Sequence, residues 1–198
     1  MKIISYRLNN ATSYGILVNN ELYSLPENQS GLPATMNAFL ALEESGMEMA
    51  RQTAQQIEAG ALVANPVSNY EILAPVPHPT SCRDGYAFRQ HVEAARKNRG
   101  VEMIPEFDQY PIFYFTNHQA VEGPGPVYCM PDHFEQLDFE LEIAIVIGKK
   151  GRNIKASEAD AYIAGFTIMN DMSARKLQME EMLLNLGPAK GKDFSTVI

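Results

Sequence analysis

The chain has 198 residues, of which 45% are hydrophobic and 20% are charged, and its formal net charge is −8. This composition is that of a globular protein with enough apolar residues to form a core. The excess of acidic residues argues against general nucleic-acid binding, because no basic stripe is present to neutralise phosphates. We therefore expect a small-molecule ligand and no nucleic-acid partner.

Residues 1–6 lead directly into strand-like sequence without an apolar signal core. No later apolar run approaches the length that spans a membrane. Cys82 and Cys129 lack the spacing of a zinc or redox motif, and two cysteines do not make a disulfide framework in a chain of this size. We predict a cytoplasmic protein with free thiols and no membrane association.

The first third of the chain predicts a small β-rich unit with two helices. Three short strands are expected, over residues 2–8, 13–18 and 21–25. Two helical patches follow over residues 35–44 and 47–58, separated by Gly46 and closed by Gly60. The alanines and methionines of these helices are spaced for packing rather than for holding a cofactor.

A proline-rich segment, Pro-Val-Pro-His-Pro over residues 75–79, follows a short predicted strand over residues 70–74. Prolines lack an amide donor and restrict the backbone, so this segment is expected to be an extended connector. We therefore predict a small N-terminal domain over residues 1–74 and a second domain over residues 75–198.

The central feature of the second domain is an apolar strand over residues 137–148 that contains Glu140 and Glu142. Side chains alternate along a strand, so both glutamates lie on one face. The other face carries apolar residues, namely Phe139, Leu141, Ile143, Ile145 and Ile147. An edge strand with one wet face shows the same alternation. Because Ala144 and Val146 continue the glutamate face, we expect a largely buried strand whose carboxylates need a positive partner.

Other polar residues allow two interpretations each. Asp84 precedes a predicted helix and is typical of an N-cap, and His91 is typical of a half-buried helix residue. Asp171, at the end of a predicted strand, is either a helix N-cap or a ligand carboxylate. Arg175 and Gln178 are three positions apart, so one helix face presents a guanidinium and an amide together.

Five motifs follow one another along the chain. They are Asp84-Gly-Tyr-Ala-Phe-Arg-Gln-His91, Pro111-Ile-Phe-Tyr114, Leu137-Asp-Phe-Glu140-Leu-Glu142, Met169-Asn-Asp171-Met-Ser-Ala-Arg175-Lys-Leu-Gln178 and Leu186-Gly-Pro-Ala-Lys-Gly-Lys192. In content and order they resemble the fumarylacetoacetate hydrolase family, closely over residues 70–198 and more loosely before that. The resemblance implies an α+β fold, in which a small β-rich N-terminal domain precedes a mixed β-roll.

The resemblance also implies a divalent cation, Mg²⁺ or alternatively Ca²⁺ or Mn²⁺. The matching ligand positions are Asp84, Glu140, Glu142 and Asp171. Hard cations take oxygen ligands, so this set of four carboxylates is chemically consistent with such an ion.

The remaining matched positions imply residues around a substrate. His91 matches the family's general base, which a later glutamate orients in the family. Glu93 is a poor substitute for that glutamate, because residues two apart on a helix do not face each other. Arg175 and Lys192 match catalytic positions that bind substrate or stabilise negative charge. The substrate-contacting positions are Tyr86, Tyr114 and Gln178.

The function that the resemblance implies is metal-dependent hydrolysis of a carbon–carbon bond in a small acylpyruvate or diketo acid, within aromatic or sugar-acid catabolism. A homodimer is also implied. Two alternatives stay open: a 2-oxo acid decarboxylase, hydratase or isomerase of the same family, and a catalytically silent metal-binding module.

Three departures from the family pattern bear on these expectations. Lys176 stands where the family often has aspartate, and Met182 stands where fumarylacetoacetase has tyrosine, so the substrate stays open. The β-roll of the family continues past Ile198, so we expect a C-terminally truncated form without the orienting glutamate. Residues 193–198 are expected to begin a strand with an unpaired apolar edge, which favours aggregation or pairing with another chain.

Overall fold

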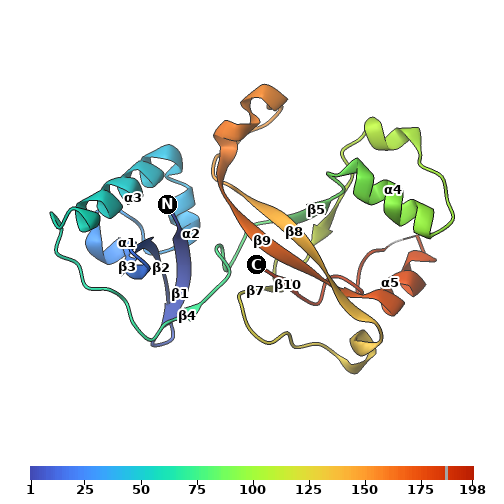
Figure 1. Cartoon of the computed structure of the whole chain (residues 1–198), viewed down its shortest axis with the longest axis horizontal. Helices are drawn as coiled ribbons and strands as arrows, with labels where there is room; N and C mark the ends of the chain where they lie inside the picture. Colours follow the sequence, from blue (N-terminus) through green and yellow to red (C-terminus); the bar gives the residue numbers. More distant parts are fainter. Residues whose placement is uncertain (186) are drawn as a thin grey trace.

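The computed structural model of the chain describes residues 1–185 and 187–198, so the motif residue Leu186 lies outside the described residues. The N-terminal elements gather on one side of the molecule and the later elements on the other (Figure 1). Helices and strands are mixed along the chain, as expected for the α+β class. Within the described residues, no helix is both long and apolar enough to cross a membrane.

The first sheet is antiparallel and has the strand order β3-β2-β1-β4. Its strands are β1 (Ile3–Leu8), β2 (Ala11–Val18), β3 (Glu21–Ser24) and β4 (Glu71–Ile72). The two hairpins turn at Asn9-Asn10 and Asn19-Asn20, and all four asparagines have positive φ. Asparagine tolerates this conformation, which two-residue hairpin turns require. Because β4 returns to pair with β1, we retain residues 1–74 and 75–198 as a proposed division into domains.

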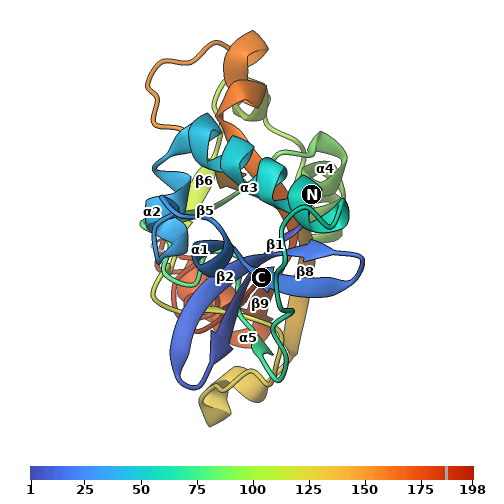
Figure 2. The same cartoon turned by 90° about the vertical axis from the view of Figure 1, so that its left-hand side faces the viewer.

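Three helices accompany this sheet, and Figure 2 views the group from its own side, with α3 above β1 and β2. They are α1 (Leu25–Asn28), α2 (Met36–Leu40) and α3 (Glu43–Glu58). Tyr14 and Ile16 of β2 pack with Leu25, Phe39 and Ala50 in the core, and each of these five side chains is at most 1% exposed. Alternate residues of β2 therefore face the helices and form the hydrophobic core of this part of the chain.

The predicted helix break at Gly46 is wrong. The chain leaves α2 at Ala41, and α3 then runs without interruption through Gly46. A Cβ at Gly46 would lie 3.0 Å from the Phe39 carbonyl oxygen and 3.0 Å from the Leu42 Cβ. The glycine therefore serves a close approach between α2 and α3 rather than a helix end.

In the described residues of the second part of the chain there are a four-stranded sheet, a two-stranded sheet and two α-helices. The larger sheet has the order β7-β10-β9-β8 and consists of β7 (Val121–Glu122), β8 (Leu137–Ile147), β9 (Ile163–Ala174) and β10 (Thr196–Val197). The smaller sheet pairs β5 (Cys82–Gly85) with β6 (Phe113–Thr116). The helices are α4 (Arg89–Asn98) and α5 (Arg175–Met182), and the 3-10 helices are η1 (Pro105–Asp108), η2 (Pro131–Phe134) and η3 (Ala156–Tyr162).

The apolar side of β8 is exposed, which contradicts the expectation that this strand is largely buried. Leu141 is 70% exposed, and Phe166, which projects from the same side on β9, is 67% exposed. We call this surface the β8–β9 apolar face; it consists of Phe139, Leu141, Ile143, Ile145, Ile147, Phe166 and Ile168. Alternation along a strand shows which residues share a face, but it does not show what covers that face.

The expected unpaired edge near the end of the sequence is not observed. Within the larger sheet β10 lies between two strands, parallel to β7 and antiparallel to β9. Both sides of Thr196–Val197 therefore have backbone partners. The apolar surface open to another molecule lies on the face of β8 and β9, and β8 is itself an edge strand of this sheet.

Candidate metal centre

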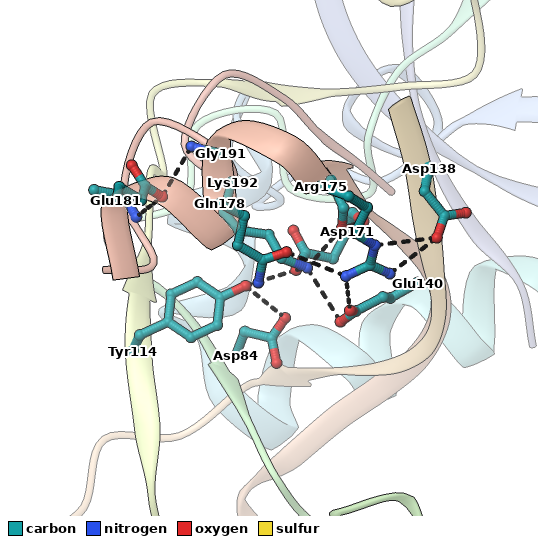
Figure 3. A network of polar contacts seen from close by, with 12 residues as sticks. Asp84, Tyr114, Asp138, Glu140, Asp171, Arg175, Gln178, Glu181, Gly191 and Lys192 are labelled. Carbon is teal, nitrogen blue, oxygen red and sulfur yellow. Dashed lines mark hydrogen bonds and ion pairs between the residues drawn. The ribbon is translucent and has the colours of Figure 1, made fainter. Parts of the chain in front are cut away.

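The candidate centre lies where the small sheet meets the glutamate side of the larger sheet (Figure 3). Asp84 comes from β5, Glu142 from β8 and Asp171 from β9. One carboxylate oxygen from each of the three lies within 4.8 Å of the others. Asp171 is fully buried and Asp84 is 8% exposed. Three strands far apart in the sequence thus bring three carboxylates together.

Neither aspartate is a helix cap, although each position allowed that interpretation. Asp84 lies within β5, and α4 begins only at Arg89. Asp171 lies within β9, opposite Glu140 of β8, and the strand continues to Ala174 before α5 begins. The side chains are therefore oriented by strand pairing, which directs them to the shared face.

Tyr114 links the two aspartates. It lies opposite Asp84 in the β5–β6 pair. Its hydroxyl is 2.6 Å from Asp171 Oδ2 and 3.1 Å from Asp84 Oδ2, so it can donate to either carboxylate. Burial, followed by the negative charge of Asp171, raises the pKa of Tyr114 well above its usual range. The hydroxyl therefore stays protonated and acts as a donor that holds the aspartates together.

Lys192 is a buried cation in the centre and is 3% exposed. Its Nζ lies 2.6 Å from Asp171 Oδ2, 2.7 Å from Ser173 Oγ and 3.1 Å from Glu140 Oε2. An ammonium group has three protons, and here three acceptors surround it. Lys192 therefore compensates part of the negative charge of the aspartate and the glutamate.

Arg175, the first residue of α5, occupies the other side of Glu140 (Figure 3). Its Nη1 donates to Glu140 Oε1 at 2.6 Å and to Gln178 Oε1 at 3.2 Å, and its Nε donates to Asp138 Oδ2 at 3.1 Å. Burial acts to raise the pKa of Glu140, but the hydrogen bond from Arg175 and the charge of Lys192 outweigh it and lower that pKa. Glu140 thus faces two cations, whereas Glu142 faces two carboxylates.

The three clustered carboxylates lack sufficient positive charge. Burial, followed by the charge of Asp84, raises the pKa of Glu142 to about 8. Burial also raises the pKa of Asp171 to about 6, despite the hydrogen bond from Lys192. Asp171 Oδ1 is buried and has no hydrogen-bond partner in residues 1–185 and 187–198. Oxygen donors without enough protons or cations are the surroundings that a hard divalent cation fits.

His91 and Tyr86 are placed differently from the other expected site residues. Both side chains are exposed, His91 on α4 and Tyr86 just before it, and their rings are 6.3 Å apart. In the described part of the chain, no hydrogen bond joins either residue to the carboxylate cluster. The structure thus connects Tyr114, Arg175, Gln178 and Lys192 with the acidic residues, while His91 and Tyr86 lie outside this network.

Two residues of the network were missed by the sequence reasoning. Asp138 binds Arg175, and Ser173 binds Lys192. Alternation along the strands could have indicated both residues, because it places Asp138 on the same face as Glu140 and Ser173 on the same face as Asp171. The sequence does not show which other segments these faces of β8 and β9 contact, so it could not show that Asp138 and Ser173 belong to the site.

Fold and site together define an α+β protein with a carboxylate centre of the kind that holds a divalent cation. The family model described as "Fumarylacetoacetate (FAA) hydrolase C-terminal" matches residues 80–198. The chain belongs to the fumarylacetoacetate hydrolase family.

Two relatives are mitochondrial oxaloacetate tautomerases by name. Fahd2a of Rattus norvegicus is 35% identical over 170 residues, which are 83% of this chain and 48% of that protein. FAHD2A of Homo sapiens is 36% identical over 150 residues, 75% of this chain and 44% of that protein. The chain thus spans about half the length of the curated relatives it matches.

Solved structures of low sequence identity share the fold. A fumarylacetoacetate hydrolase from Exiguobacterium antarcticum has a TM-score of 0.67 at 22% identity, covering 98% of this chain and 62% of that one. A maleylpyruvate hydrolase from Sphingobium sp. SYK-6, in complex with manganese(II) and pyruvate, has a TM-score of 0.60 at 18% identity. The match covers 88% of this chain and 60% of that one. The α+β fold expected from the motifs is confirmed.

Proposed function

We propose that the chain binds a divalent cation through Asp84, Glu142 and Asp171 and uses this centre to enolise a small 2-oxo acid. The observation that carries this proposal is the buried Asp171 Oδ1, which has no hydrogen-bond partner among the residues that the structure describes and lies beside two further carboxylates. The manganese(II) and pyruvate named with the Sphingobium hydrolase support the ligand classes. Mg²⁺, Mn²⁺ and Ca²⁺ are all candidates, and Glu140 stays a proposed fourth ligand.

Such a cation, when bound, polarises the oxygens of a chelating 2-oxo acid and stabilises the negative charge of its enolate. The protein's own contribution is to hold its charged groups in place before the substrate arrives. Tyr114 keeps the two aspartates together, and Lys192 compensates Asp171. Arg175 is oriented toward Glu140, so a substrate carboxylate can compete with that glutamate for the guanidinium.

Among reactions that form an enolate, keto–enol tautomerisation of a 2-oxo dicarboxylate is our first candidate. The named activity of relatives about 35% identical supports it. The reaction moves one proton from carbon to oxygen and needs no activated water. His91 is the proposed group that accepts the proton, with Tyr86 and Gln178 proposed to contact the substrate.

Hydrolytic cleavage of a carbon–carbon bond in an acylpyruvate or diketo acid is the second candidate. The hydrolase description of the matching family and the hydrolase names of two structural neighbours favour it. In this reaction His91 would activate water. Decarboxylation and hydration use the same enolate chemistry, and a silent metal-binding module would show no turnover.

One experiment separates these outcomes. The purified chain, with Mn²⁺, is offered oxaloacetate enriched in its enol form and, separately, a panel of acylpyruvates; the enol is followed by ultraviolet absorbance and the products by NMR. We expect faster equilibration of enol and keto forms, lost with EDTA and in Asp171→Asn. Two acid fragments from an acylpyruvate would instead support hydrolysis, and Mn²⁺ binding without turnover would support the silent module.

Cytoplasmic location and a homodimer stay proposals. The relatives named above carry mitochondrial names, so the compartment of this chain needs direct localisation. The β8–β9 apolar face is the surface on which we propose that a second copy packs.

A further inference from the structure

The loop that carries Lys192 is attached to α5 through one carboxylate. Glu181, near the end of α5, accepts hydrogen bonds at Oε1 from the backbone N–H of Ala189 at 2.6 Å and of Gly191 at 3.1 Å. Figure 3 shows Glu181 beside Gly191, with Lys192 extending from there toward Asp171. The two donors belong to the three residues that immediately precede the lysine.

The same loop is fixed from its other side. The Gly191 carbonyl accepts a hydrogen bond from the Ala174 N–H at 2.9 Å, at the end of β9. A Cβ on Gly191 would lie 2.7 Å from the Gln178 Cα, so only glycine lets the loop lie this close to α5. Lys192 follows directly, so the position of Gly191 determines from where the lysine side chain starts.

Glu181 differs in its surroundings from Glu140, which pairs with Arg175 and Lys192. In the described residues Glu181 forms no ion pair, and its carboxylate is used on backbone N–H groups. Glu180, the preceding residue, is exposed and forms no hydrogen bond with this loop in the described residues. A carboxylate that accepts two backbone N–H groups holds a segment more firmly than a neutral acceptor does.

We propose that Glu181 is a positioning residue, which holds the loop at residues 187–191 so that Lys192 reaches Asp171 and Glu140. The consequence of this role of Glu181 for catalysis rests on the proposed function, whereas the effect of Glu181 on the position of Lys192 does not. Along α5, Arg175 then contacts the carboxylates directly, Gln178 contacts Arg175, and Glu181 acts on the centre through the loop.

Lysine acetylation of the cation-free chain, read by peptide mass spectrometry, tests the proposal without any assay of activity. In the unaltered chain, Lys192 should react far more slowly than the exposed Lys150, because it is buried. In Glu181→Ala we expect Lys192 to react about tenfold faster relative to Lys150, since loss of two hydrogen bonds lets the loop open. Unchanged protection of Lys192 would overturn the proposal.

Two matched variants control the result. Glu181→Gln retains an oxygen that accepts both N–H groups and should keep Lys192 largely protected. Glu180→Ala removes the neighbouring charge and should leave Lys192 as in the unaltered chain. Equal deprotection in Glu180→Ala and Glu181→Ala would show a general loosening of α5 and contradict the proposal.

Amide hydrogen exchange provides a test that needs no substitution, should Glu181→Ala fail to fold. NMR of the unaltered chain should show slow amide exchange at Ala189 and Gly191, because both N–H groups donate hydrogen bonds to Glu181. Fast exchange at both amides would overturn the proposal. If turnover is established, Glu181→Ala should lower kcat more than it raises KM; absence of turnover rejects the proposed function and leaves the acetylation result standing.

Discussion

At the scale of single residues, the two oxygens of Asp171 have different surroundings. Oδ2 accepts hydrogen bonds from Tyr114 and Lys192, whereas Oδ1 is buried without a partner in the described residues. An unpaired buried acceptor costs about 1–3 kcal/mol. A cation shared with Asp84 and Glu142 removes that cost, which is why we assign the ion to this triad.

Glu142→Gln separates the cation site from the fold. In the unaltered chain, cation at about 100 times its Kd should add roughly 2.7 kcal/mol to the free energy of unfolding. The variant should lose most of this gain, yet without cation it should be at least as stable, because the neutral amide does not have to take up a proton on folding as Glu142 does. Thermal unfolding with and without Mn²⁺ measures the stability of the cation-free variant and the gain from the cation. Glu158→Gln, which removes a charge away from the carboxylate cluster, is the control. Full Mn²⁺ stabilisation of the variant would contradict the assignment.

The raised pKa of Glu142 predicts how stability depends on pH. In the cation-free chain this pKa is about 8, against an ordinary value of 4.5, so the folded chain binds a proton that the unfolded chain has lost. The free energy of unfolding should therefore fall as pH rises between these values. Mn²⁺ takes the place of the proton, so its stabilising effect should grow over the same range. Calorimetry at several pH values, in EDTA and in Mn²⁺, tests this pH dependence. A stabilisation by Mn²⁺ that becomes smaller as pH rises would contradict the prediction.

Lys192 should be essential for stability, because it is the buried cation between two carboxylates. Lys192→Met leaves Asp171 and Glu140 without their ammonium partner, and breaking a buried pair in this way costs about 3–5 kcal/mol. Urea unfolding measures the loss, with the exposed Lys150→Met as control. Equal stability of the two variants would show that Lys192 is not needed to balance the site's charge.

At the scale of elements, strand pairing organises the centre. The register of β8 and β9 places Glu140 opposite Asp171, and the β5–β6 pair places Asp84 opposite Tyr114. Helix α5 starts at Arg175 immediately after β9, so its first residues lie against the carboxylates. The centre therefore depends on how the two later sheets meet. Among the described residues, the N-terminal sheet provides no side chain to it.

This independence leads to a prediction about the proposed domains. Phe39 is 1% exposed in the N-terminal core, so Phe39→Ala should destabilise that part by about 3–5 kcal/mol. If residues 1–74 form a separate unit, calorimetry should show one shifted transition while Mn²⁺ still stabilises the other. A single transition that shifts as a whole would show that the two parts unfold together.

At the scale of the whole molecule, the β8–β9 apolar face consists of exposed side chains. Exposed apolar surface of this kind is typical of an interaction site. We expect concentration-dependent self-association, which Ile143→Lys should weaken; Val63→Lys, which alters an exposed apolar residue elsewhere, should not. Light scattering after size-exclusion chromatography gives the mass at each concentration. A monomer at all concentrations would reject the homodimer.

Much of the local structure could be predicted from the sequence. Alternation identified β8 and the shared face of Glu140 and Glu142, and the Asn-Asn pair at residues 19–20 separates two of the expected strands. That the helix continues through Gly46 could not be foreseen, because a glycine is used both at helix ends and at close contacts. Only the neighbouring Phe39 shows which use applies here.

The sequence by itself determined the family motifs, the types of the candidate residues and the face on which each strand carries its carboxylates. Only the tertiary structure decided that Glu140 pairs with Arg175 and Lys192 while Glu142 meets Asp84 and Asp171. Only it showed that the apolar side of β8 is open and that Thr196–Val197 is paired on both sides. The reason is physical: side-chain direction follows from local backbone geometry, whereas charge pairing and burial depend on segments far apart in the chain.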